Sequence, residues 1–405
     1  MLKKIVKEGD FMQYVGLKRI FHQDEKMWKE LYNIRFNSEL CRHLGIKIHQ
    51  NECFYVINEE ILNLIEKIYR INSWFDRLDL PNMAKSYMIF SSLLEEIHSS
   101  NKIEGIHSTH KELKELATSD SSNSLKRFYG MVNKYSKILR GEFEKVETSS
   151  DVRKLYDEIL YRDVIEEDSE DDLDGLFFRK GPVEVSSGLK TIHKGINGEE
   201  IIIDWMDRSL KILNNEDIPF FVRIAVFYYF FEYIHPFYNG NGRMGRLLVC
   251  GYLCEQMNTL CAFQFSIACL HNRTDYYKMF QETSQEKNNA DLTVFIIHFL
   301  EIYIKGLKEL KDTVEEKNEY YLSLKKKLRQ KFKDDDFYFL HSLLLVTIFS
   351  FEGMTMSEMV ENEKMTQQTL RNKIKNINEK YPIIKINKEN KPYHYELNIK
   401  TILGL

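Results

Sequence analysis

The sequence has few of the residues that interrupt regular structure, with 18 glycines and 6 prolines among 405 residues. Because these two residues mark turns, their scarcity disfavours a turn-rich all-β fold and favours helices. Hydrophobic residues make up 43% of the chain and charged residues 29%, which excludes an intrinsically disordered chain. The length is sufficient for two or three domains with cores of their own.

The chain also lacks an excess of basic charge. Its formal net charge is −4, so the composition gives no overall signature of nucleic-acid binding, and any such role must be local. The first residues do not follow the basic, apolar, small-residue order of a signal peptide. The most apolar stretch, 218–237, contains Arg223, Glu232 and His235, which argues against a membrane span. We therefore expect a cytoplasmic location and no membrane partner.

No cysteine spacing is typical of a metal site. Cys250 and Cys254 are four residues apart and share a helix face, but the neighbouring residues Leu247–Val249 are apolar. We therefore expect buried free thiols rather than half of a metal site, in keeping with a reducing compartment.

Helical periodicity is the main pattern that the sequence does contain. Residues up to about 115 are expected to form helices with short connectors, and 60–72 has a clear apolar face. Long helical patterns resume at Ile202 and continue to about Lys333. We expect three domains: an N-terminal helical domain at 1–115, a catalytic core at 116–333 and a C-terminal domain at 334–405.

Three segments break the helical pattern. The Ser/Asp/Asn run at 118–124 predicts an exposed loop. The segment 163–174 holds eight acidic residues, and their mutual repulsion predicts a solvated surface loop. Alternation within 182–193 around a Ser-Ser-Gly turn predicts a short β-hairpin, the one hairpin that the pattern indicates before the C-terminal domain.

The C-terminal residues 335–405 predict three short helices followed by two strands, at 383–386 and 393–397, which is the plan of a winged helix. Residues 365–405 contain eight Lys or Arg against three acidic residues. The helix expected at 366–379 carries three of these basic residues, so contact with DNA phosphates is one possibility. The alternative is a platform for a partner or for a homodimer.

The most informative segment is His235–Arg246, which reads His-Pro-Phe-Tyr-Asn-Gly-Asn-Gly-Arg-Met-Gly-Arg. It lies between apolar helices expected at 220–234 and 244–257. The proline ends the first helix, and Gly240 and Gly242 allow a tight loop at the start of the second. Such a loop directs several backbone N–H groups to one point beside the positive end of a helix dipole, which predicts a phosphate site.

Three side chains of this segment suit phosphate chemistry. Arg243 and Arg246 are three residues apart on the new helix and can face the same polyphosphate. His235 stands at the entrance of the loop, where it could act as a base that activates a nucleophile. A simple turn with two solvated arginines is the alternative, but the full combination of residues favours a functional site.

These residues resemble the signature of the Fic family, His-Pro-Phe-x-acidic-Gly-Asn-Gly-Arg-x-x-Arg. Flanking residues agree: Asn272–Tyr277 resembles the segment beside the adenine, and Gly175–His193 resembles the β-hairpin flap of that family. The resemblance covers about Leu80 to Gly306. It implies a mainly α fold, namely a Fic helical core with a β-hairpin flap, plus an N-terminal helical domain and a C-terminal winged helix.

The resemblance implies a protein adenylyltransferase that uses Mg²⁺ and moves AMP from ATP to a Tyr, Thr or Ser hydroxyl of a target, with self-modification expected. His235 would take the proton of the hydroxyl, and the flap would hold the target by strand addition. The implied ATP-binding residues are Gly240, Asn241, Gly242, Arg243, Met244, Gly245, Arg246, Asn272 and Tyr277, and the implied flap residues are Thr191, Ile192 and His193.

One position departs from the family signature. Asn239 stands where the family has an acidic residue that binds Mg²⁺. A neutral amide oxygen is a poorer ligand for this ion than a carboxylate, so we expect a weakened metal site at Asn239. The departure leaves two alternatives open: transfer of another phosphate-linked group, and a nucleotide-sensing DNA-binding regulator with little turnover.

A second motif lies upstream, where Ser100-Asn-Lys-Ile-Glu104-Gly105 follows a helical run that starts near Met88. A glycine after such a run is typical of a helix C-terminus. The segment resembles the Fic inhibitory motif, Ser/Thr-x-x-x-Glu-Gly/Asn. The resemblance implies that Glu104 pairs with Arg246, which would otherwise meet the γ-phosphate, so that ATP binds with a misaligned α-phosphate. It also implies that a reverse reaction, removal of AMP, can occur.

Overall fold

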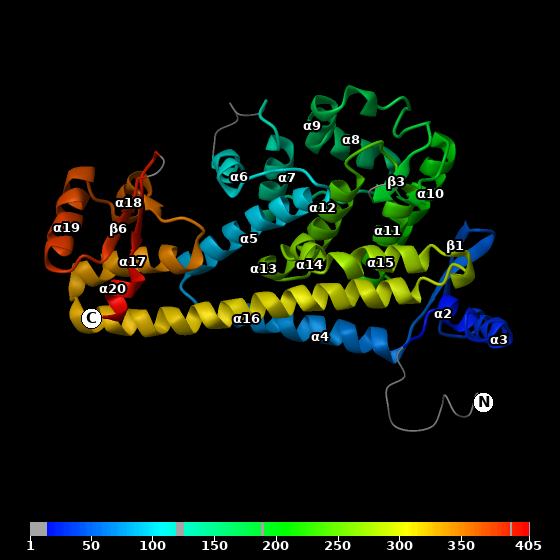
Figure 1. Ribbon diagram of the computed structural model, residues 1–405, viewed down its shortest axis with the longest axis horizontal. Coiled ribbons are helices and arrows are strands. Elements are labelled where there is room, and N and C mark those ends of the chain that lie inside the picture. The colour runs from blue at the N-terminus through cyan, green and yellow to red at the C-terminus, as the bar shows by residue number, and fades with distance from the viewer. Residues whose placement is uncertain (1–13, 119–124, 188–189, 389–390, 405) are drawn as a thin grey trace, which may run out of the picture. The chain divides into compact units, whose positions relative to one another are not determined.

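The computed structural model describes residues 14–118, 125–187, 190–388 and 391–404 (Figure 1). The loop expected at 118–124 lies outside the described residues apart from its first residue, and so do the tip of the hairpin and the turn between the two C-terminal strands. Within the described ranges, no helix has both the length and the apolar character that crossing a bilayer requires.

The chain divides into two compact units. The first consists of the described residues of Met1–Trp74 together with Glu95–Leu307, and the second of Phe75–Leu94 together with Lys308–Leu405. Two long helices, α5 (Asn82–Ile103) and α16 (Thr293–Lys331), contribute residues to both. The three domains predicted at 1–115, 116–333 and 334–405 remain a prediction, and the compact units group the chain differently.

The first unit begins with helices, as predicted for residues up to about 115, and also contains a hairpin that this prediction missed. Strands β1 (Cys41–Ile48) and β2 (Asn51–Val56) pair antiparallel. The apolar run at the end of β2 is too short for periodicity to distinguish a strand from a helix. Phe54 bonds through its backbone to Ala290 and Leu292, at 3.2 and 2.8 Å, a contact that no local pattern contains. The helices around this hairpin are α2 (Leu17–Phe21), α3 (Glu25–Phe36) and α4 (Glu59–Asp76), and α4 confirms the helix expected at 60–72.

The core of the first unit is built around α11 (Phe220–Ile234), whose residues are buried with the exception of Glu232 and Tyr233. A helix that is apolar on all sides is stable only inside the fold, with other helices around it. Helices α10 (Glu199–Leu213) and α12 (Asn241–Leu253) pack against α11. The other helices of this unit are α6 (His110–Ala117), α7 (Tyr129–Leu139), α8 (Ser149–Ile159), α9 (Tyr161–Glu167), α13 (Thr259–Ala262), α14 (Phe265–His271), α15 (Arg273–Thr283) and the short 3-10 helix η3 (Glu286–Asn288).

The acidic segment 163–174 is not the solvated loop that its charge predicted. Its first residues end α9, and the 3-10 helix η2 (Ser169–Asp171) follows. Asp163 is only 5% exposed, and its Oδ2 accepts a hydrogen bond of 2.9 Å from the backbone N–H of Phe128. Val164 is fully buried beside it. The number of charges in the segment could not reveal these buried residues, because the burial of the Asp163 carboxylate depends on a donor at Phe128, 35 residues away in the sequence.

The prediction of free thiols is confirmed. All six cysteines lie in the described part of the chain and are unpaired, and five of them are buried, with Cys254 half-buried. Burial raises the pKa of Cys53 to about 12 and that of Cys41 to about 11. These thiols are therefore core residues rather than reactive groups.

The second unit ends in a small domain with a three-stranded antiparallel sheet in the order β5-β7-β6. The two strands expected at 383–386 and 393–397 are present, and the short strand β5 adds to them. The helix expected at 366–379 is α19, which begins after the capping hydroxyl of Thr366. The elements are α17 (Asp334–Phe349), β5 (Met354–Thr355), α18 (Met356–Glu363), α19 (Gln367–Lys380), β6 (Ile384–Asn387), β7 (His394–Leu397) and α20 (Ile399–Leu403).

Candidate active site

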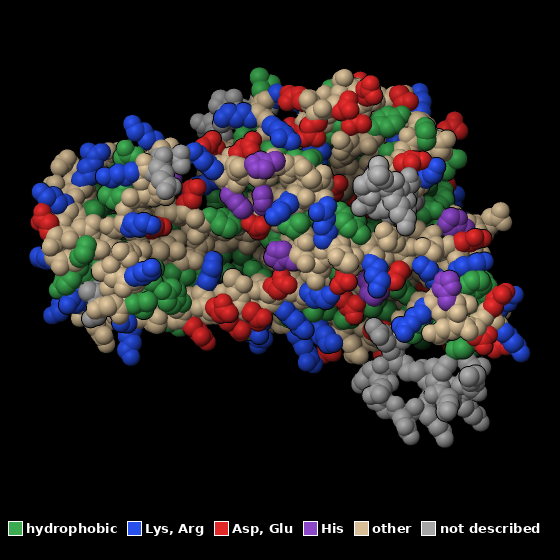
Figure 2. Space-filling view, in the orientation of Figure 1, with side chains coloured by type: hydrophobic (Ala, Val, Ile, Leu, Met, Phe, Trp, Pro, Cys, Tyr) green, Lys and Arg blue, Asp and Glu red, His purple; other side chains and the backbone are tan. Residues whose placement is uncertain are grey.

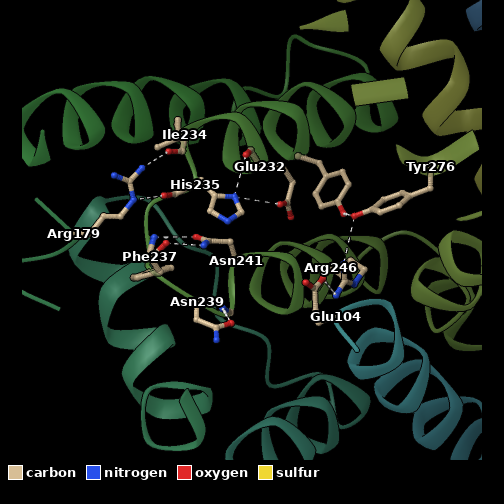
Figure 3. A network of polar contacts seen from close by, with 12 residues as sticks. Glu104, Arg179, Glu232, Ile234, His235, Phe237, Asn239, Asn241, Arg246 and Tyr276 are labelled. Carbon is tan, nitrogen blue, oxygen red and sulfur yellow. Dashed lines mark hydrogen bonds and ion pairs between the residues drawn. The ribbon is translucent and has the colours of Figure 1, made fainter. Parts of the chain in front are cut away.

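The loop between α11 and α12 has the tight conformation that its sequence predicts. His235 ends α11 with a φ of 52°, and Gly240 precedes α12 with a φ of 85°. Only glycine adopts the second value without strain. The side chain of Asn241 closes the loop by accepting from the N–H of Phe237 at 2.9 Å and donating to its carbonyl at 2.8 Å (Figure 3). Asn241 therefore shapes the loop with its side chain, and α12 begins at Asn241 rather than at Met244.

Arg179 supports the loop from outside the motif. It is fully buried, and its Nε donates to the carbonyl of His235 at 2.8 Å. Its Nη2 donates to the carbonyls of Ile196 and Ile234, at 2.7 and 3.2 Å. Figure 3 shows this guanidinium directed at the end of α11. Sequence reasoning missed Arg179, because its acceptors are backbone carbonyls, which leave no pattern in the sequence.

An aromatic pair supports the opposite side of the loop. The rings of Tyr156, from α8, and Phe237 stack with centroids 3.8 Å apart. The hydroxyl of Tyr156 also donates to the carbonyl of Asn239 at 3.2 Å. The loop is thus held by side chains from both flanks, which preorganises its backbone N–H groups for an anion.

His235 lies beside the half-buried carboxyl group of Glu232. Its Nδ1 is 3.3 Å from the carbonyl of Glu232 and 4.0 Å from the Oε2 of the same residue. A carbonyl can only accept, so in this contact Nδ1 is the donor and Nε2 is the basic nitrogen. Burial raises the pKa of Glu232 to about 8, and Arg246 opposes this shift. The ring is therefore oriented with a nitrogen that can accept a proton.

Arg243 is the unusual residue of the site. Its side chain is fully buried, and its Nε, Nη1 and Nη2 have no hydrogen-bond partner among the described residues. The closest carboxylate oxygen, Oε2 of Glu167, is 3.7 Å from Nη2. Burial lowers the pKa of Arg243, and the charge of Glu167 opposes this shift. Buried polar groups are nearly always paired, so this guanidinium fits a site for an anion.

Arg246, one turn further along α12, is fully paired. Its Nη2 contacts Oε1 of Glu104 at 2.8 Å, and the expected contact between these residues is thus present (Figure 3). Its Nε donates to the hydroxyl of Ser100 at 3.0 Å and Nη2 to the carbonyl of Ser100 at 2.9 Å. The hydroxyl of Tyr276 is 3.4 Å from Nη1. Burial lowers the pKa of Arg246, but the electrostatic effects of Glu104, Tyr276, Tyr228 and Glu232 together outweigh burial and hold the pKa above its ordinary value.

The carboxylate of Glu104 lies over the first turn of α12. It follows the end of α5, where Gly105 adopts a φ of 77°. A Cβ atom added to Gly242 would collide with Oε1 of Glu104 and approach Nη1 of Arg246 to 2.9 Å. The Glu104 carboxylate therefore occupies space at a helix N-terminus that suits an anion.

The other residues that the sequence implied for ATP binding have different surroundings. Asn272 lies at the N-cap position of α15 without a side-chain capping bond, and its Nδ2 donates instead to the carbonyl of Ala268 at 3.0 Å. The hydroxyl of Tyr277 donates to the carbonyl of Ile103 at 3.4 Å, next to Glu104. Met244 is buried in the core, and Gly245 leaves space for Glu232, because an added Cβ would lie 2.7 Å from Oε1 of that residue.

The predicted hairpin is present as β3 (Glu184–Ser187) and β4 (Lys190–Lys194). The backbones of Thr191, Ile192 and His193 lie in β4. Thr191 is paired with Ser186, and His193 with Val185. The base of the hairpin is fixed by a hydrogen bond of 3.0 Å from the N–H of Gly195 to the carbonyl of Val183.

Asn239 faces a carboxylate that sequence reasoning did not connect with it. Its Nδ2 donates to Oδ2 of Asp171 at 3.0 Å, and its Oδ1 accepts from the N–H of Gly240 at 2.6 Å. In the described ranges no group of three or more His, Cys, Asp and Glu side chains is arranged to hold a metal ion. A Mg²⁺ ion bound together with a nucleotide needs only one or two protein oxygens, which this pair can offer.

A helical protein with a glycine loop and two buried arginines on one helix has the features of a phosphate-binding enzyme. Comparison with known proteins gives the family: residues 147–253 match the Fic/DOC family. This segment contains α8, α11, α12 and the loop between the last two, so the part of the chain that carries the candidate site is a Fic/DOC domain.

Solved structures similar to this chain include other Fic proteins. A Fic family protein from Desulfovibrio desulfuricans G20 is 18% identical with a TM-score of 0.49, over 85% of this chain and 97% of that one. Fic-1 (residues 134–508) from C. elegans is 14% identical with a TM-score of 0.42, over 63% of this chain and 73% of that one. A Fic domain containing signaling protein from Bacteroides thetaiotaomicron VPI-5482 is 18% identical with a TM-score of 0.40, over 62% of this chain and 95% of that one.

Proposed function

We propose that this protein transfers AMP from ATP to a hydroxyl group of a protein and that Glu104 inhibits the transfer in cis. The observation that carries the proposal is the buried guanidinium of Arg243 beside the glycine loop, which has no hydrogen-bond partner among the described residues and a single carboxylate 3.7 Å away. A buried cation is costly unless an anion compensates it. The β-phosphate of ATP would supply this anion, and the N–H groups at the start of α12 would hold the neighbouring oxygens.

The chemistry would be an in-line displacement at the α-phosphorus. Nε2 of His235 would take the proton of a Tyr, Thr or Ser hydroxyl while the hydroxyl oxygen forms its bond to the α-phosphorus. The bond from this phosphorus to the bridging oxygen would break, and pyrophosphate would leave. The N–H groups of Gly240, Asn241 and Gly242 would stabilise the charge that develops on the phosphate oxygens.

The donor set also fits magnesium bound with the nucleotide. Asn239 and Asp171 offer an amide oxygen and a carboxylate beside the loop, and oxygen ligands are those that this ion prefers. When bound, Mg²⁺ would neutralise part of the phosphate charge. The hairpin β3–β4 would present its backbone to an extended segment of the target.

Inhibition would act through Arg246. Its guanidinium is engaged by Glu104 and Ser100, so the γ-phosphate would lack its partner. ATP would then bind with its α-phosphate displaced from His235, and a small displacement is sufficient to slow the transfer greatly. The same carboxylate could orient a water molecule for the reverse reaction, removal of AMP from a modified target.

Intact-protein mass spectrometry of a Glu104→Gly variant incubated with ATP and Mg²⁺ tests the proposal. We expect the protein to gain the mass of an AMP group by self-modification. A gain of the mass of a phosphate group would favour the alternative that Asn239 keeps open, transfer of another phosphate-linked group. No covalent gain together with tight ATP binding would favour a nucleotide sensor.

A second candidate function rests on the C-terminal domain. The order of its elements is that of a winged helix, with α19 in the position that contacts DNA in such domains. Figure 2 shows Lys and Arg side chains over α19. Arg371 is exposed, whereas Lys373 and Lys375 lie 3.7 and 3.8 Å from the carboxylates of Asp336 and Glu379. A DNA mobility-shift titration at several salt concentrations tests this role, because phosphate contacts weaken steeply with salt.

A further inference from the structure

The contact between Asn239 and Asp171 places a negative charge beside the glycine loop without an acid in the loop itself. Asn239 donates from Nδ2 to Oδ2 of Asp171 at 3.0 Å. An aspartate at 239 could not donate this bond, and two carboxylates at that distance would repel each other. The pair therefore carries one negative charge, the same number as the acidic residue of the Fic signature.

The carboxylate is held in this position by the fold of the acidic segment. Asp168 caps η2 by accepting from the N–H of Glu170 at 2.9 Å, and Tyr161 donates to Asp172 at 2.9 Å. Upstream, Glu167 pairs with Arg127 at 2.7 Å. Asp171 lies between these fixed points and has its oxygen directed at the loop. Figure 2 shows acidic side chains over α8 and α9, and η2 follows α9 in the chain.

The charges of Asp171 and Arg243 both lie close to the glycine loop. Burial raises the pKa of the Tyr156 hydroxyl, Arg243 lowers it and Asp171 raises it, so both charges lie within electrostatic reach of one phenol under the loop. Arg243 is buried, without a hydrogen-bond partner among the described residues, and fits a phosphate. A carboxylate beside a bound polyphosphate would repel it, and a divalent cation between them turns the repulsion into attraction.

We infer that Asp171, held by Asn239, supplies the charged oxygen ligand of the magnesium ion that accompanies the nucleotide in this protein. The inference rests on the proposed function, because it requires a nucleotide at the loop. Asn239 is then a positioning residue for the carboxylate rather than the principal ligand, and the departure from the family signature is compensated from η2.

The test measures ATP binding by calorimetry in a Glu104→Gly, His235→Ala protein, in which Arg246 is released and transfer is blocked. The dissociation constant is measured in EDTA and in saturating Mg²⁺ for this parent, for Asp171→Asn and for Glu170→Gln. Glu170 is the matched control, since it is an exposed carboxylate one residue away on η2. Melting curves without ATP verify that all three fold alike.

In the parent, Mg²⁺ should tighten ATP binding. Asp171→Asn should reduce this gain in affinity by about tenfold, as expected for the loss of one carboxylate–cation pair at a partly exposed site. In EDTA, Asp171→Asn should bind ATP more tightly than the parent, because the repulsion is removed. Glu170→Gln should follow the parent in both conditions. An unchanged Mg²⁺ gain in Asp171→Asn would overturn the inference while leaving the proposed function intact. Absence of ATP binding in every variant and both conditions would contradict the proposed function itself.

Discussion

Removal of the Glu104 carboxylate is the perturbation with the clearest structural consequence. In Glu104→Gly, Arg246 loses one contact of 2.8 Å but keeps the hydroxyl and the carbonyl of Ser100, so its guanidinium stays in position. The guanidinium is fully buried, and the Glu104 side chain is 36% exposed. Because this exposure screens the pair, we assign it about 1–3 kcal/mol rather than the larger value of a fully buried pair.

Three results should follow from removal of this contact. Without nucleotide, Glu104→Gly should have a lower Tm than the wild type, because the charge of Arg246 is left with less compensation. With ATP, the γ-phosphate no longer competes with the carboxylate, so self-labelling should rise by about tenfold or more. The ATP-induced increase in Tm should also be larger in the variant, since binding stabilises the folded state by mass action.

The assay compares labelling by α-labelled ATP, and Tm with and without ATP, in the wild type and in three variants, the first of which is Glu104→Gly. Glu104→Gln is expected to be activated in part, because it keeps the size of the side chain and loses the charge. Glu115→Gln is the control, since Glu115 is an exposed carboxylate of α6 remote from the loop in the sequence. Equal and strong labelling of the wild type and Glu104→Gly would refute the inhibitory role.

Three further substitutions test individual residues. Arg243→Gln should leave the Tm of the nucleotide-free protein unchanged or higher, because it removes a buried charge that has no hydrogen-bond partner among the described residues and one carboxylate at 3.7 Å. It should abolish the ATP-induced rise in Tm, because the phosphate loses its cationic partner; a persistent rise would count against the anion site. Because burial raises the pKa of Glu232 from 4.5 to about 8, the free energy of unfolding should fall as the pH rises between these values, by up to about 1.4 kcal/mol per pH unit. Glu232→Gln should flatten this slope in denaturant titrations, and an identical slope would contradict the assignment. Asn239→Asp in the Glu104→Gly background replaces the hydrogen bond to Asp171 with a second carboxylate, and a bound Mg²⁺ ion would relieve the repulsion between the two. The Mg²⁺ concentration for half-maximal labelling should therefore fall; an unchanged or higher requirement would refute this view.

The sequence was informative wherever local chemistry decides the structure. Pro236 and Gly240 specify the end of one helix and the entry to the next, and the helix expected at 220–234 is present with those bounds. The contact between Glu104 and Arg246 was also anticipated, although it joins residues 142 positions apart. That expectation came from resemblance to a family, because no periodicity links such distant positions.

The sequence was uninformative where a role depends on distant partners. Arg179 acts on backbone carbonyls, and the charge of Asp171 was hidden in an acidic run that repulsion alone would leave in solvent. The lack of a hydrogen-bond partner for Arg243 among the described residues could not be inferred either, since it depends on burial by several elements at once. The hairpin β1–β2 was missed because β2 depends on backbone bonds to residues 290 and 292.

The central claim is the identity of the transferred group, and ATP labelled separately at its α- and γ-phosphates tests it most directly. Glu104→Gly protein incubated with Mg²⁺ and either label should retain the α-label covalently and release the γ-label with pyrophosphate. Glu104→Gly, His235→Ala protein should retain neither label while still binding ATP, because the imidazole acts on the hydroxyl. Covalent retention of the γ-label, or labelling that persists without His235, would contradict the account.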